Sequence, residues 1–176
     1  NNYINCLYED SKGNIWIGTN SGGLNVFNWN TGIIEVFRQE ADKQNALPDN
    51  NVLDIQDDKK GNVWILTVAD GLVSCNPADR KFKRFTEDKK GIPLGVVSAF
   101  FIDKDGLFWI YSDSKGLLTY EPSDSEGFNN IKGPAGEMIP EVHSIIQDEY
   151  GKIWIGTENG IFLYNKKSKT INRLNY

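Results

Sequence analysis

The sequence predicts an all-β protein made of β-propeller blades, with four blades that are each a four-stranded antiparallel sheet. Two observations lead to this fold class. Trp recurs at intervals of 48, 45 and 45 residues, each time preceded by Asp at −6 and Gly at −3. Each interval also contains strand-like segments separated by turn residues. The four copies of the motif are Asp10–Trp16, Asp58–Trp64, Asp103–Trp109 and Asp148–Trp154.

The first repeat shows how one blade is expected to form. Asp10 begins a tight turn in which its carboxylate can accept a hydrogen bond from the backbone two residues later. Gly13 can take a positive φ there without steric cost. The expected strands cover residues 4–8, 14–19, 24–28 and 33–38. Applied to the whole chain, the period gives blades at about residues 1–46, 47–91, 92–136 and 137–176.

The Trp residues are predicted to pack between blades. Apolar residues flank each Trp, as Ile15 and Ile17 flank Trp16, so the strand is apolar on both faces and should be buried on both. The innermost strand of each repeat has a modest side chain at its centre, which suits strands that crowd a central axis. These side chains are Cys6, Asp54, Ala99 and Ser144.

Composition narrows the class of partner. The 176 residues carry a net charge of −5, which argues against nucleic acid and anionic membrane surfaces. No apolar run approaches the roughly 20 residues that span a bilayer. The chain begins with Asn1 rather than Met, so we expect a fragment or a processed product. Cys6 and Cys75 occupy different repeat positions and are expected to be free, buried thiols.

The repeat resembles the regulator propeller repeats of hybrid two-component sensor histidine kinases. The pattern is Asp-x-x-Gly-x-apolar-Trp-Ile-Gly-Thr, followed by Gly and an aliphatic residue. The resemblance is closest at Ile15–Thr19 and Ile153–Thr157. The other two copies depart from it, with Leu66 and Tyr111 in place of Gly and Ser112 in place of Thr. The repeats of WD40 proteins, sialidases and quinoproteins fit less well, because their signature residues are absent or differently spaced.

The resemblance implies a periplasmic sensor region of an inner-membrane protein, usually with seven blades in each propeller. In such proteins this region precedes an immunoglobulin-like domain, a membrane helix and a cytoplasmic kinase. Many of them recognise oligosaccharides and induce genes for polysaccharide use. The expected partners are therefore an oligosaccharide and the remaining blades of the parent propeller. The chain carries no kinase motif, so no enzymatic activity is expected of this segment.

Propeller ligands usually bind at one mouth of the axial channel. The loops there join the second strand to the third, and the fourth strand to the next first strand. Their polar side chains could contact a ligand or could be solvated turns. The candidate ligand-binding residues are Asn20, Asp70, Asp113, Lys115, His143, Glu158 and Asn159.

No catalytic residue, metal site or cofactor is predicted. His143 is the only histidine, and no cluster of Cys or His accompanies it. The segment Asp103–Gly106 resembles part of a calcium loop but lacks the remaining ligands. Trp29 lies outside the repeat and could stack on a sugar or pack on a neighbouring loop.

Three functions remain open on the sequence. The first is ligand sensing outside the cytoplasm, the second a scaffold for a protein partner, and the third a propeller lyase, lactonase or glycosidase. The third is weakest, since Asp54 is the only acidic residue among the aligned inner positions. Four blades are expected to form an open arc with two apolar end faces, through which the chain would associate as a homodimer.

Overall fold

The computed structural model describes residues 3–40, 43, 45–123 and 127–174. These residues form sixteen strands in four antiparallel sheets, and each sheet has four strands in sequence order. The predicted fold class is thus confirmed. Nowhere in the described ranges is there a helix, and therefore none long and apolar enough to cross a membrane.

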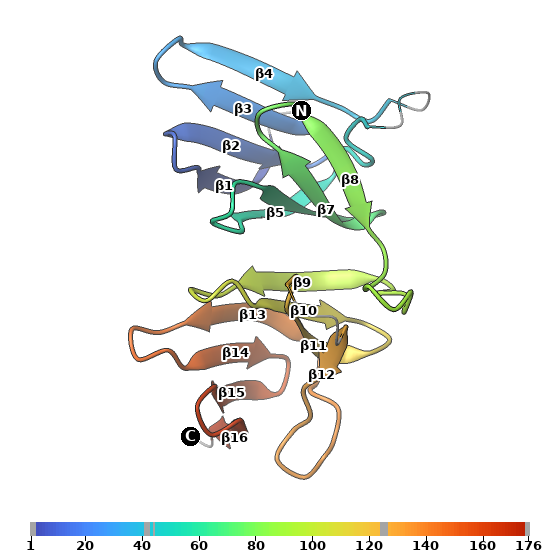
Figure 1. Ribbon diagram of the computed structural model, residues 1–176, viewed down its shortest axis with the longest axis vertical. Coiled ribbons are helices and arrows are strands. Elements are labelled where there is room, and N and C mark those ends of the chain that lie inside the picture. Colours follow the sequence, from blue (N-terminus) through green and yellow to red (C-terminus); the bar gives the residue numbers. More distant parts are fainter. Residues whose placement is uncertain (1–2, 41–42, 44, 124–126, 175–176) are drawn as a thin grey trace. The chain divides into compact units, whose positions relative to one another are not determined.

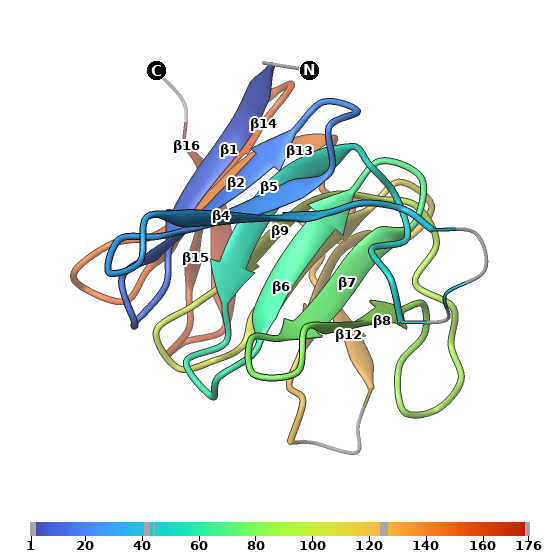
Figure 2. The same ribbon diagram turned by 90° about the horizontal axis from the view of Figure 1, so that it is seen from above.

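The first compact unit, Asn1–Phe85, contains two sheets, which we call blades 1 and 2. Blade 1 consists of β1 (Ile4–Glu9), β2 (Asn14–Thr19), β3 (Leu24–Asn28) and β4 (Ile33–Phe37). Blade 2 consists of β5 (Val52–Asp57), β6 (Val63–Thr67), β7 (Gly71–Asn76) and β8 (Lys81–Phe85). In Figure 2 the strands from β5 to β8 lie side by side in that order. The innermost strands β1 and β5 contact each other.

The second compact unit, Thr86–Tyr176, contains blades 3 and 4. Blade 3 consists of β9 (Val97–Ile102), β10 (Phe108–Ser112), β11 (Gly116–Tyr120) and β12 (Phe128–Asn130). Blade 4 consists of β13 (Val142–Gln147), β14 (Ile153–Thr157), β15 (Gly160–Asn165) and β16 (Thr170–Leu174). Figure 1 shows β13 lying beside β9, as their contacts require.

The repeated Asp does more than begin a turn. In blade 1, Asp10 Oδ1 accepts hydrogen bonds from the backbone N–H groups of Lys12 and Asn14, both at 2.9 Å. Its other oxygen accepts the indole N–H of Trp16 at 2.9 Å. The same indole bond recurs in the other blades at 3.3, 3.1 and 2.9 Å. The six-residue spacing between Asp and Trp therefore allows the indole N–H to bond to the carboxylate at the start of the turn.

In each unit the repeat Trp of the first blade faces the second blade. The guanidinium of Arg80, from blade 2, lies 5.4 Å from the ring of Trp16. In the second unit, Trp109 meets Tyr164 of blade 4 edge-on, with ring centroids 5.1 Å apart. Trp16 and Trp109 are both fully buried. The predicted packing of Trp between blades is confirmed for these two pairs.

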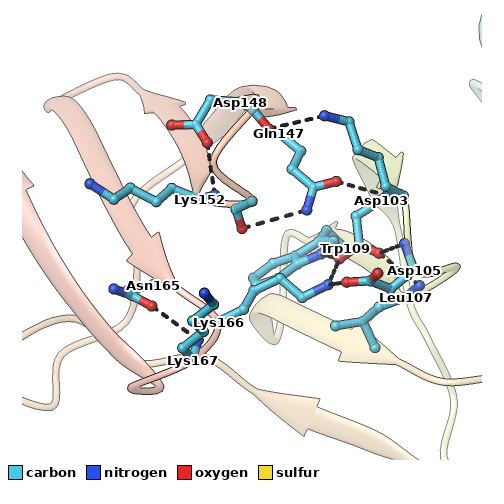
Figure 3. A network of polar contacts seen from close by, with 12 residues as sticks. Asp103, Asp105, Leu107, Trp109, Gln147, Asp148, Lys152, Asn165, Lys166 and Lys167 are labelled. Atoms are coloured by element: carbon cyan, nitrogen blue, oxygen red, sulfur yellow. Dashed lines mark hydrogen bonds and ion pairs between the residues drawn. The ribbon is translucent and has the colours of Figure 1, made fainter.

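Polar contacts also join blades 3 and 4 (Figure 3). Lys166 of blade 4 forms ion pairs with the buried Asp103 and with Asp105, the latter at 2.6 Å. Burial alone would lower the pKa of Lys166, but its hydrogen bonds to the two carboxylates outweigh burial and raise it. Nearby, the backbone N–H of Lys104 donates to the side chain of Gln147 at 2.8 Å. Asp103 thus holds both its own Trp and the neighbouring blade.

Both cysteines are free thiols, as predicted. Cys75 is fully buried in the core of the first unit, and Cys6 is partly buried against that core. Burial raises the pKa of each thiol to about 12, and for Cys6 the nearby Asp54 adds to the increase.

Candidate functional site

Every innermost strand contains a β-bulge at the same repeat position. The register skips one residue in each strand, and that residue stands eleven positions before the repeat Trp. All four bulged side chains are exposed. Bulges of this kind redirect a side chain and are common at the rims of barrels and beside binding sites. The bulged residues are Asn5, Leu53, Ser98 and His143.

A second repeated feature fixes the loops beside these bulges. In each blade the residue four positions after Trp donates its backbone N–H to the carbonyl of the residue directly before the innermost strand. The four bonds measure 3.0 to 3.1 Å. They join Asn20 to Tyr3, Val68 to Asn51, Asp113 to Val96, and Glu158 to Glu141. In each unit we call the four residues joined by these bonds and the two bulged residues the rim of that unit.

The rim of the first unit is uncharged. It combines the amides of Asn5, Asn20 and Asn51 with the exposed ring of Tyr3, of which 66% is accessible. Asn51 is held in place, since its side-chain oxygen accepts the backbone N–H of Ser21 at 2.8 Å. The amide of Asn5 donates to a backbone carbonyl of blade 2 at 2.8 Å. These groups can donate and accept hydrogen bonds next to an aromatic face.

The rim of the second unit is acidic. Burial raises the pKa of Tyr111, and the negative charges of Asp113, Glu141 and Glu158 raise it further. The structure therefore brings Asp113 and Glu158 into one electrostatic neighbourhood, together with Glu141. The hydroxyl of Ser98 donates to Asp113 at 2.9 Å.

Three of the predicted site residues have a different local role. Asp70, Lys115 and Asn159 each stand directly before the Gly that begins the third strand. Each is bound by a side chain of the outermost strand of its own blade. The bonds run from Arg84 to the carboxylate of Asp70 at 2.6 Å, from Asn130 to the carbonyl of Lys115 at 2.5 Å, and from Arg173 to the carbonyl of Asn159 at 2.5 Å.

The seven predicted residues thus fall into two groups. Asn20, Asp113, Glu158 and His143 belong to the rim, whereas Asp70, Lys115 and Asn159 join their loops to the outer strands. Sequence analysis missed Asn5 and Ser98 as rim residues. Comparison of the repeats at the eleventh position before Trp would have found both, because that position carries His143 in the fourth copy.

Asp103 and Trp29, which the sequence also singled out, contact other residues of the fold. The side chain of Asp103 is fully buried and already bonded to Trp109 and Lys166. Trp29 remains 70% exposed and meets Phe27 edge-on, with ring centroids 5.0 Å apart. Within the described part of the chain, no group of three or more His, Cys, Asp or Glu side chains is arranged to hold a metal ion.

Three segments of the chain, residues 1–21, 46–69 and 137–159, match the family model described as "Two component regulator propeller". Each segment contains the Asp turn and the repeat Trp of its blade. The third copy, where Tyr111 and Ser112 depart from the pattern, lies outside the matched segments. The resemblance inferred from the repeat is therefore confirmed.

Solved structures from B. thetaiotaomicron give the same result. The extracellular domain of the hybrid two component system BT3049 is 25% identical, with a TM-score of 0.77 over 96% of this chain. The corresponding domain of BT4673 is also 25% identical, with a TM-score of 0.73 over 98% of this chain. The chain covers only 23% and 25% of those two structures.

A more distant structure shares the fold alone. The gluconolactonase XC5397 from Xanthomonas campestris is 11% identical, with a TM-score of 0.67 over 97% of this chain and 61% of its own. No curated protein matches the sequence.

Proposed function

Because the chain carries repeats of the two component regulator propeller type, we propose that it is a ligand-sensing segment of a hybrid two-component sensor. We place that segment in the periplasm, in line with relatives described as extracellular domains. In this proposal the four blades, at about residues 1–46, 47–91, 92–136 and 137–176, belong to a seven-bladed ring. The rest of that ring, the membrane anchor and the kinase belong to the parent protein.

The proposed ligand is an oligosaccharide, and its binding would control the transcription of genes for polysaccharide use. The supporting observation is the composition of the rim. In the first unit, amides can hydrogen-bond to sugar hydroxyl groups beside the exposed ring of Tyr3, which can cover an apolar sugar face. In the second unit, carboxylates and the hydroxyl of Ser98 can do the same hydrogen bonding. Asn5, Ser98 and His143 stand on bulges of the inner strands, and backbone hydrogen bonds hold the loops that carry the other side chains.

Calorimetry with a panel of oligosaccharides tests the proposal on a full-length sensor region that contains this chain. A binding sugar should lose at least tenfold in affinity when Asn20 or Glu158 is changed to Ala. The exposed Glu149, in the turn at the other end of β14, provides the matched control, and Glu149→Ala should bind as the unaltered protein does. Equal binding by all variants would show that the rim is not the site.

A protein partner is the second candidate. Val96 and Met138 are 61% and 50% exposed on loops of the second unit, and such apolar side chains suit a protein surface. An enzymatic role has less support. Asp54, the acidic residue among the inner positions, bonds to Gln56 at 3.1 Å, and burial raises its pKa. The relatives at 25% identity are described as extracellular domains of two component systems.

A further inference from the structure

The amide of Asn51 has a fixed orientation in the rim of the first unit. Its oxygen accepts the backbone N–H of Ser21 at 2.8 Å, and because an N–H group can only donate, the oxygen must lie on that side. Ser21 is itself held there with a φ of 65°, a value that residues other than glycine seldom adopt. The amide N–H groups of Asn51 therefore point away from Ser21, and Asn51 is presented as a hydrogen-bond donor.

The amide of Asn5 is fixed in the opposite sense. Its N–H donates to the carbonyl of Val52 at 2.8 Å, and because a carbonyl can only accept, the nitrogen must lie on that side. Its oxygen is left as an acceptor on the far side of the planar amide. Val52 directly follows Asn51 in the chain, so the two amides lie close together. The first unit thus presents a fixed donor beside a fixed acceptor, and neither carries a charge.

This pair of amides suits an uncharged ligand that carries hydroxyl groups. A hydroxyl group can both donate to Asn5 and accept from Asn51, and sugars carry such groups on adjacent carbon atoms. A carboxylate or sulfate group has only acceptor oxygens, so it would set an oxygen against the oxygen of Asn5 with no proton between them. The rim of the first unit also has no Lys or Arg side chain to balance such a group.

The rim of the second unit disfavours anions through its charge. Asp113, Glu141 and Glu158 place three carboxylates in one electrostatic neighbourhood. The backbone carbonyl of Glu141 accepts the N–H of Glu158 at 3.0 Å, which holds these two residues side by side. The hydroxyl of Ser98 donates to Asp113 at 2.9 Å, so its proton is already engaged. An anionic group would therefore meet repulsion here without a donor to offset it.

The arginines bound to the adjoining loops are already engaged. Arg84 donates to the carboxylate of Asp70 at 2.6 Å, and Arg173 donates to the carbonyl of Asn159 at 2.5 Å. Lys115 adds a single ammonium group to the second unit, which does not balance three carboxylates. The net charge of the chain is −5, and its field adds to the repulsion of anions.

We propose that the rims of the two units select uncharged sugar units and exclude oligosaccharides that carry carboxylate or sulfate groups. This inference rests on the proposed function, because it names the class of sugar that the same residues would bind. Each unit disfavours an anion by itself, so the selection does not depend on how the two units are arranged. Repulsion of unwanted ligands is a common source of specificity.

Paired ligands test the proposal on a full-length sensor region that contains this chain. Each pair consists of two tetrasaccharides that differ only at the sixth carbon atom of each sugar, which is a hydroxymethyl group in one member and a carboxylate in the other. In calorimetry at low salt, the neutral member should bind at least about tenfold more tightly than the carboxylate member. A carboxylate member that binds as tightly as the neutral one would overturn the proposal.

Salt distinguishes repulsion from a poor fit of shape. Between about 10 mM and about 1 M salt, the screening length falls from roughly 30 to 3 Å. The ratio of the two affinities should therefore decrease at least about threefold, while the affinity of the neutral member stays the same. A ratio that does not change with salt would show that charge is not the cause.

Two substitutions should change this ratio in opposite directions. Glu141→Gln removes a carboxylate but keeps the backbone carbonyl that holds Glu158, so the ratio should decrease at least about threefold. Asn51→Asp adds a carboxylate but keeps an oxygen that can accept the N–H of Ser21, so the ratio should increase at least about threefold. Glu149→Gln, in the exposed turn at the other end of β14, is the control and should leave the ratio unchanged. A ratio that neither rim substitution changes would overturn the proposal.

The same measurements separate this proposal from the proposed function. If no tetrasaccharide binds, or if Asn20→Ala leaves every affinity unchanged, the proposed function fails and the charge selection fails with it. If the carboxylate members bind more tightly and Asn20→Ala weakens their binding, the rim residues still bind the ligand and only the selection against charge is wrong.

Discussion

The pairing of Asp and Trp is the basic unit of this fold at the scale of the residue. One carboxylate receives two backbone N–H groups and one indole N–H, so that a tight turn and a buried ring are fixed together. Sequence patterns showed both residues but not the bond between them. The bond depends on the path of the turn, which returns the ring to the carboxylate six residues away.

Replacement of Trp64 by Ala should lower the free energy of unfolding by about 3–5 kcal/mol, since the side chain is only 9% exposed. The loss combines the apolar area with the cavity that remains. Trp29→Ala is the control at a 70% exposed position and should cost less than about 1 kcal/mol. Chemical denaturation measures both values. A loss below about 1 kcal/mol for Trp64→Ala would contradict its burial.

Acid should destabilise the protein through the same turns. Burial alone would raise the pKa of Asp58, but hydrogen bonds from Asn62, Lys60 and Trp64 outweigh it and lower the pKa. Asp10 behaves in the same way. In the unfolded chain these groups titrate near 3.8, so the stability they provide is present above that pH. It is lost as the pH falls below it, through the folded pKa.

Denaturant unfolding at pH 6 and pH 3 checks this expectation. The denaturant concentration at the unfolding midpoint should be lower at pH 3 than at pH 6. This decrease should be smaller in Asp58→Asn, which removes one titrating group. An equal fall in both proteins would show that Asp58 does not contribute.

At the scale of the element, each blade depends on its neighbour for the burial of one face. β6 and β10 are buried at every position, whereas β2 and β14 alternate between buried and partly buried positions. All four strands have nearly the same apolar sequence. Within the first unit, Trp16 of β2 is buried on the side of blade 2, whereas Ile15 and Ile17 on the other face of β2 are only partly buried.

Lys166→Met should weaken the contact between blades 3 and 4. The change removes the ion pairs to Asp103 and Asp105 and leaves the buried Asp103 without its cation. We expect a loss of about 2 kcal/mol in unfolding free energy. Lys167 is adjacent and exposed, so Lys167→Met is the matched control and should change stability by less than about 0.5 kcal/mol. Similar losses for both variants would exclude a specific role for Lys166.

At the scale of the whole molecule, changes at the proposed ligand-binding residues should leave the stability of the fold unchanged. Asp113 and Glu158 are exposed, and their backbone N–H groups bond to Val96 and Glu141 whatever side chain they carry. The double change to Ala should leave the unfolding midpoint within about 2 °C of the unaltered value, since surface changes alter stability little. Differential scanning calorimetry provides the measurement. Loss of cooperative unfolding would show that these residues are structural and would remove them from the proposed site.

A turn in the second unit shows where pattern recognition reached its limit. Asp88 accepts the backbone N–H groups of Lys90 and Ile92, as the repeated Asp residues do in their turns. No Trp follows it, and its second oxygen accepts the backbone N–H of Phe128 at 2.9 Å. The repeat pattern of Asp and Trp does not include this turn, because Leu94 stands six residues after Asp88.

The sequence by itself determined the number of repeats, the strands of the first repeat and the burial of Trp16, Trp64 and Trp109. Those features follow from local turn chemistry and from the alternation of apolar residues, which a single repeat already contains. Only the tertiary structure decided which polar loop residues gather at the rim and which are tied to the outer strands. That division depends on bulges and on hydrogen bonds between strands, such as Arg84 to Asp70, whose partners lie far apart in the chain. Leu7 and Ile55 occupy the same repeat position, yet Leu7 is exposed and Ile55 is buried. The sequence of one repeat cannot determine this difference, because burial of a sheet face requires a second sheet.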